Sequence, residues 1–156
     1  MWDWVRAHKF RSALILLGLF VLVEAATIPW FAVPDLKKEN PGQTALMRQR
    51  LREAEAAGKK LKITQAWVPM ARISPDLIEA VIVAEDGTFR SHGGVDWFEV
   101  RESFEKNVRE FRAARGASTI TQQLAKNLYL STSKDPLRKA KELVITVLLE
   151  QSLSKD

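Results

Sequence analysis

Residues 116–127 read GASTITQQLAKN, and this stretch fixes where two helices meet. Gly116 is expected to end one helix, because glycine is the residue most often found just past a helix C-terminus. Thr119 followed by Gln122 is a capping-box pattern that starts a new helix, expected to run to about Leu130. The start of this second helix therefore carries a concentration of hydroxyl and amide groups.

The sequence on both sides of this stretch is helical as well. Capping residues predict helices that begin after Thr44, Ser74, Asp96 and Asp135. The expected apolar stripes are Leu77, Ile78, Val81 and Ile82 on the second of these helices, Phe104, Val108 and Phe111 on the third, and Leu137, Val144, Val147 and Leu148 on the fourth. Only residues 61–70 favour an extended segment. The fold class predicted is mainly α.

Composition limits the function classes. The 156 residues are enough for one modest domain with an appendage, and the net charge of +5 favours an anionic partner. Nucleic acid, an acidic membrane surface and a phosphorylated substrate all qualify, but acidic residues are mixed too evenly among the basic ones for a nucleic-acid interface. The sequence contains no Cys, which excludes disulfides, thiolate catalysis and Cys-based metal sites.

Residues 1–33 are predicted to attach the chain to a membrane. Residues 1–11 are basic and expected to be cytoplasmic, and residues 12–33 form an apolar run whose only charge is Glu24. An uncleaved, single-pass signal anchor is favoured over a signal peptide cleaved near Ala25. Residues 34–66 are then a juxtamembrane linker and helix, and residues 67–156 the catalytic part, outside the membrane.

Glu85 is the first candidate for chemistry. It follows Val81 by four residues and Ile82 by three, so helical geometry places it on the predicted apolar stripe. Partial desolvation there would raise its pKa and suit it to general acid or base work. The alternative is that the helix ends at Ala84 and Glu85 turns into solvent.

Two further groups carry polar chemistry. Gln123, Lys126 and Asn127 share one helix face and offer donors for phosphate or sugar oxygens, unless Lys126 simply belongs to a solvated face. Arg138, Lys139 and Glu142 cluster on the last helix, either as an exposed Arg–Glu pair or as a cationic cradle for a leaving diphosphate.

Three motifs, in order, resemble the peptidoglycan glycosyltransferases of family 51. They are EDGTFRSHGGVD at residues 85–96, GASTITQQLAKN at residues 116–127 and RKAKE at residues 138–142. The resemblance is clear from about residue 67 to residue 156 and is closest to the monofunctional biosynthetic type. Members of that family polymerise lipid II into glycan strands. Their domain continues beyond the motifs present here, so the chain is expected to hold the N-terminal part of a lysozyme-like domain.

The resemblance implies a role for each motif residue. Glu85 would deprotonate the 4-hydroxyl of the acceptor, Asp86 would support the catalytic pocket, and Glu142 would be the second important carboxylate. The residues expected to contact the sugars and diphosphate of the substrate are Ser118, Thr119, Gln123, Lys126, Asn127, Arg138 and Lys139. Mg²⁺ or Mn²⁺ often assists the diphosphate in this family, and the sequence assigns no metal ligand.

The implied reaction also names partners and a location. Attack on an α-linked lipid diphosphate gives a β-1,4 bond with inversion, so one base suffices, and cations placed beforehand stabilise the leaving diphosphate. Expected partners are lipid II, the growing glycan strand, membrane lipids and proteins of cell-wall synthesis or division, at the bacterial inner membrane with the catalytic part on the periplasmic side. The alternatives are a lytic muramidase and an inactive, membrane-tethered fragment that binds lipid II.

Overall fold

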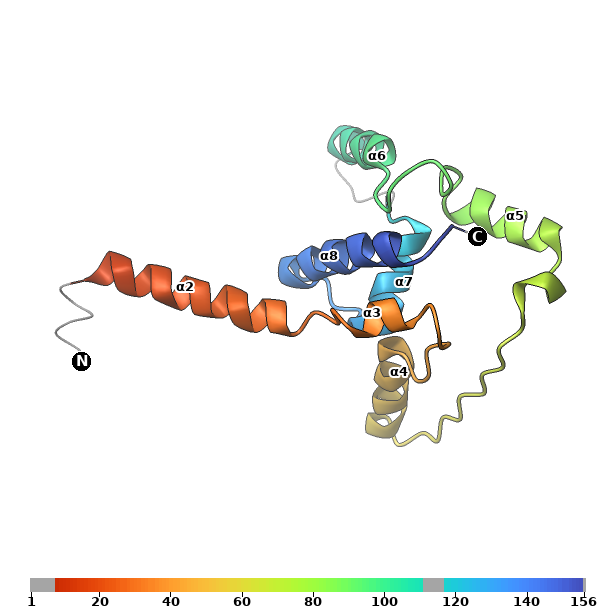
Figure 1. The fold of residues 1–156 in the computed structure, drawn as a ribbon, viewed down its shortest axis with the longest axis horizontal. Helices are drawn as coiled ribbons and strands as arrows, with labels where there is room; N and C mark the ends of the chain where they lie inside the picture. The colour runs from red at the N-terminus through yellow and green to blue at the C-terminus, as the bar shows by residue number, and fades with distance from the viewer. Residues whose placement is uncertain (1–7, 111–116, 156) are drawn as a thin grey trace.

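The computed structural model describes residues 8–110 and 117–155 (Figure 1). The predictions made for residues 1–7, Phe111 and Gly116 therefore lie outside the described residues. The helices are α2 (Lys9–Ala26), α3 (Ala32–Asp35), α4 (Ala45–Ala56), the short 3₁₀ helix η1 (Met70–Arg72), α5 (Pro75–Glu85), α6 (Trp97–Glu110), α7 (Ile120–Tyr129) and α8 (Pro136–Ser152). Every regular element in the described part is helical, which confirms the predicted mainly α class.

The core forms where α7 meets α8. α7 also packs on α4, and α3 packs on α8. The fully packed residues of this core are Val33, Ala125, Ile145 and Leu149. Helices α5 and α6 lie at the edge of the molecule, and α2 extends away from it (Figure 1).

Local capping accounts for where α4, α7 and α8 begin. The Thr44 hydroxyl accepts the N–H of Met47, and Thr119 with Gln122 forms the complete capping box. The Asp135 carboxylate accepts the N–H of Arg138 at 2.7 Å. Each of these contacts satisfies an N–H group that the first turn of a helix leaves without a partner, so the predicted starts are confirmed.

The buried face of α8 differs from the predicted one. Leu137, Val144 and Val147 are exposed, and the helix instead buries a face of mixed polarity. That face consists of Glu142, Ile145, Thr146 and Leu149. Thr146 is 0% exposed, and its hydroxyl donates to the Glu142 carbonyl at 2.7 Å. This hydrogen bond offsets the cost of burying the hydroxyl. A pattern of apolar residues could not predict this face, because two of its four buried residues are polar.

The predicted stripe of α5 is buried only at Ile82, and that of α6 is exposed at Phe104 and Val108. Leu77 and Val81 are exposed, and Ile82 is the buried residue of α5. On α6, Phe104 is 68% exposed, and Ser103 is the buried residue. Most of the predicted apolar residues on these two helices are therefore exposed.

The N-terminal region departs from the predicted boundaries. A helix that meets both the length and the hydropathy of a membrane span is absent from residues 8–110 and 117–155. α2 ends at Ala26, and Val33, which was assigned to the span, is 0% exposed in the core against Ile145 and Leu149. Within the predicted linker, α3 packs on α8 and α4 packs on α7, so both helices belong to the packed domain.

Candidate functional site

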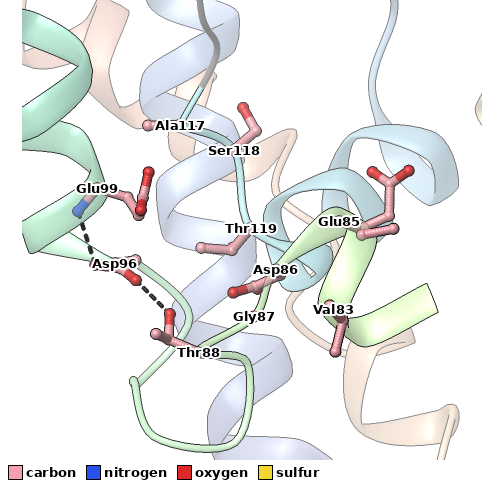
Figure 2. Close-up of a pocket in the computed structure, with 11 residues that line it drawn as sticks. Val83, Glu85, Asp86, Gly87, Thr88, Asp96, Glu99, Ala117, Ser118 and Thr119 are labelled. Atoms are coloured by element: carbon pink, nitrogen blue, oxygen red, sulfur yellow. Dashed lines mark hydrogen bonds between the residues drawn. The ribbon is translucent and has the colours of Figure 1, made fainter. Parts of the chain in front are cut away.

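A cleft of about 250 Å³ opens where the end of α5 faces the start of α6 (Figure 2). Its lining is rich in carboxylates and hydroxyls. The polar side chains that line it are Glu85, Asp86, Thr88, Asp96, Glu99, Ser118 and Thr119. Figure 2 places residues 117–119 along the back of this cleft, between α5 and α6. The first two sequence motifs are therefore brought together in space, as the resemblance requires.

Asp86 and His92 form the buried centre of this region. The Asp86 carboxylate lies 2.9 Å and 3.0 Å, through its two oxygens, from Nε2 of His92. The backbone N–H of Gly94 donates to Nδ1 of the same ring at 3.1 Å. A backbone N–H can only donate, so Nδ1 must carry a lone pair, and the proton of a neutral ring lies on Nε2. In this geometry the His92 ring donates from Nε2 to the Asp86 carboxylate and accepts at Nδ1.

The same carboxylate also ties α5 to α7. Asp86 Oδ2 accepts the backbone N–H of Ile120 at 3.0 Å, in the first turn of α7. The Thr119 hydroxyl in turn donates to the Gly94 carbonyl at 2.6 Å. Asp86 thus contacts both His92 and the start of α7, and its role in catalysis stays a prediction. Thr119 is buried where it lines the cleft, and its predicted contact with a substrate stays a prediction.

Glu85 lies at the mouth of the cleft. Its Oε2 accepts a hydrogen bond from the Gln123 side-chain amide of α7 at 2.9 Å. The predicted desolvation is wrong, since Glu85 is exposed. The reason is that α5 ends at this residue and the stripe it would continue, at Val81, is itself exposed. What positions this carboxylate is a hydrogen bond from the second motif and not burial.

Thr88, Asp96 and Glu99 are site residues that the sequence did not single out as such. The Asp96 carboxylate accepts the Thr88 hydroxyl through Oδ2 and the Glu99 N–H at 2.9 Å through Oδ1 (Figure 2). The Thr88 hydrogen bond, followed by that from Glu99, lowers the pKa of Asp96. The capping pattern at Asp96 and Glu99 was visible in the sequence, but nothing in it indicated that they line a cleft.

Behind the cleft, Glu150 of α8 joins several segments. Its Oε1 accepts the Thr121 hydroxyl at 2.5 Å and pairs with the Lys155 ammonium at 2.7 Å. Gly94 packs directly against it: a Cβ added at Gly94 would lie 2.7 Å from Glu150 Cγ. Lys155 also lies 4.2 Å from the centre of the Phe89 ring. This contact set holds the turn that contains His92 and Gly94 against α8.

The third motif forms a separate cluster. Glu142, whose side chain is 3% exposed, pairs with Arg138 and Lys139 at 2.5 Å each. The interpretation as an exposed Arg–Glu pair is therefore wrong, because the carboxylate is buried between two cations. Arg138 lines a second cleft of about 320 Å³ with residues of α2 and α7. Arg138 and Glu150 are twelve residues apart in α8, which corresponds to about 18 Å along the helix axis.

The remaining predicted binding residues lie between or beside these clefts. Ser118 is exposed at the first cleft, while Lys126 and Asn127 are half-buried on α7. Within residues 8–110 and 117–155, no group of three or more His, Asp or Glu side chains is arranged to hold a metal ion.

Comparison with known proteins agrees with the motif pattern. A family model described as Transglycosylase matches residues 52–156. Three relatives are each named biosynthetic peptidoglycan transglycosylase. The relative from Aromatoleum aromaticum is 45% identical over 148 residues, covering 93% of this chain and 62% of its own length. That from Azoarcus sp. is 40% identical over 155 residues, and that from Bordetella pertussis 37% over 159; each alignment covers 99% of this chain and 64% of the relative. The chain thus spans less than two thirds of the length of these relatives.

Proposed function

Because this chain belongs to the transglycosylase family, we propose that it is a peptidoglycan glycosyltransferase that polymerises lipid II into β-1,4 glycan strands. The observation that carries the proposal is the Glu85 carboxylate, exposed at a cleft and oriented by Gln123 of the second motif. Cell-wall synthesis is the process in which such a reaction takes part.

Glu85 acts as the base in this proposal. Gln123 engages its Oε2, and within the described residues Oε1 has no hydrogen-bond donor, so it is available to accept the proton of the acceptor 4-hydroxyl. The acceptor oxygen forms a bond to the anomeric carbon of the donor as the bond from that carbon to the diphosphate breaks. The configuration inverts, and undecaprenyl diphosphate leaves with the electron pair of the broken bond.

The cations of the third motif suit the leaving diphosphate. Arg138 and Lys139 share one carboxylate, Glu142, so the trio retains one positive charge in a fixed geometry. Lys126 and Asn127 of α7 are the further polar groups proposed to contact the substrate.

A membrane attachment through α2 completes the proposal. The large apolar residues from Leu14 to Val23 are all exposed, and they surround the helix on every side. A helix that is apolar all round is stable only in a protein core or in lipid. We therefore propose that α2 inserts into the bacterial inner membrane, with the cleft on its periplasmic side, where lipid-linked substrates are confined.

Product analysis tests the reaction type. The chain, reconstituted in vesicles, is given lipid II with and without Mn²⁺, and separately finished glycan strands. Polymer formed from lipid II, with undecaprenyl diphosphate released in step, is the expected result. Cleavage of finished strands without polymer formation would instead identify a muramidase, and binding of lipid II without turnover would identify an inactive tether.

A further inference from the structure

The one acidic residue of the apolar N-terminal run has a specific partner. Glu24, in the last turn of α2, forms an ion pair with Lys141 of α8. Both side chains are largely buried, at 24% and 20% exposed. A carboxylate near a helix C-terminus is disfavoured by the helix dipole, and in an apolar setting it also loses hydration. Lys141 offsets both costs, so the two residues have a reason to stay together.

The end of α2 is closed by its own chain. The Thr27 hydroxyl donates to the Glu24 carbonyl at 2.6 Å, and the Trp30 indole N–H donates to the Ala25 carbonyl at 2.8 Å. These contacts satisfy carbonyls that a helix end otherwise leaves to water. The break between α2 and α3 is therefore a defined turn at a fixed place.

Beyond this turn, the chain is attached to α8 a second time. Val33 of α3 is buried against Ile145 and Leu149 of α8, whereas Glu24 of α2 binds Lys141. Lys141 and Leu149 are separated by about 12 Å along the axis of α8. Two attachments separated in this way restrict both the position and the tilt of α2 relative to α8. Figure 1 shows the first turns of α8 lying beside the end of α2.

The ion pair also borders a cleft that holds a proposed substrate contact. Glu24, Arg138 and Lys141 all line the cleft of about 320 Å³. We propose that Glu24 and Lys141 are positioning residues: their ion pair holds the Arg138–Glu142 cluster at a set height above the membrane into which α2 inserts. This inference rests on the proposed function for its consequence, but the contact itself does not depend on activity.

Crosslinking tests the contact directly. The chain contains no Cys, so Glu24→Cys with Lys141→Cys introduces the only two thiols. A thiol-reactive crosslinker should join the two Cys residues in membranes if its spacer is as long as the two side chains of a Glu–Lys ion pair. The matched control is Glu24→Cys with Val147→Cys, since Val147 is exposed about 9 Å further along α8 and roughly 120° around its axis. Equal crosslinking of both pairs, or none in the first pair when both thiols react singly, would overturn the proposal.

Charge reversal tests the consequence. Glu24→Lys and Lys141→Glu should each raise KM for bilayer-embedded lipid II about tenfold, and the double reversal should restore it to within about twofold. With a water-soluble, short-chain donor, which needs no set height, each variant should retain its KM. Loss with both donors, or a double reversal no better than the single ones, would contradict a positioning role. The crosslink needs no turnover, so it still decides the contact if the proposed function fails.

Discussion

Replacing Gly94 with Ala should destabilise the packing of its turn against α8. Gly94 has a φ of +88°, and a Cβ there would lie 2.7 Å from both Thr146 Cγ2 and Glu150 Cγ. Neither neighbour can move easily, because Thr146 is fully buried and Glu150 is held by Thr121 and Lys155. A side chain at a left-handed φ costs about 1–2 kcal/mol and overpacking about 1–3 kcal/mol, so the free energy of unfolding should fall by about 2–5 kcal/mol.

Two other glycines separate these contributions. Gly58 has a φ of +65° with nothing near its Cβ position, and Gly93 has open space there and no positive φ. In urea unfolding, Gly58→Ala should lose about 1 kcal/mol from backbone strain, and Gly93→Ala should change stability by less than about 0.5 kcal/mol. Equal free energies of unfolding for Gly94→Ala and Gly93→Ala would show that this turn is not closely packed on α8.

Three further predictions concern single side chains. Glu142→Gln should cost about 2–4 kcal/mol in thermal unfolding, because it leaves a largely buried Arg138 guanidinium without its counter-ion; an unchanged melting temperature would contradict this. Thr119→Ala should cost about 1–2 kcal/mol through loss of the α7 cap, with Thr119→Ser close to wild type. Because the pKa of Asp96 is lowered in the folded state, its ionised carboxylate stabilises the fold at pH values above its unfolded pKa of about 3.9. This stabilisation is lost as the pH falls through the folded pKa. Thr88→Val should therefore make the free energy of unfolding, measured in urea, decrease less steeply as the pH is lowered below about 4.

What the sequence predicted well is local. The capping box at Thr119 and Gln122 involves residues three apart, and the helix starts at Thr44 and Asp135 follow from equally short-range contacts. The mainly α class was predicted from the same short-range capping and periodicity patterns. The family match to residues 52–156 agrees with the resemblance stated from those motifs.

What the sequence could not predict depends on contacts across the fold. Glu150 and Gly94 are far apart in the chain, and only the packed structure brings them together. The sequence shows Glu24 as the one charge in an apolar run, but it does not show that Lys141 of α8 is its partner. The desolvation expected for Glu85 required its helix stripe to be buried, and periodicity gives the stripe but not what covers it.

The most direct test of the account is the rate of lipid II polymerisation by Glu85→Gln relative to the unchanged chain. Gln keeps the shape of the side chain but cannot take a proton, and because Glu85 is exposed the fold should be unaffected. Unfolding curves of the two proteins should therefore coincide, while the rate falls by about 10²-fold or more. A folded Glu85→Gln variant that polymerises lipid II within about threefold of the unchanged chain would contradict the assignment of Glu85 as the base.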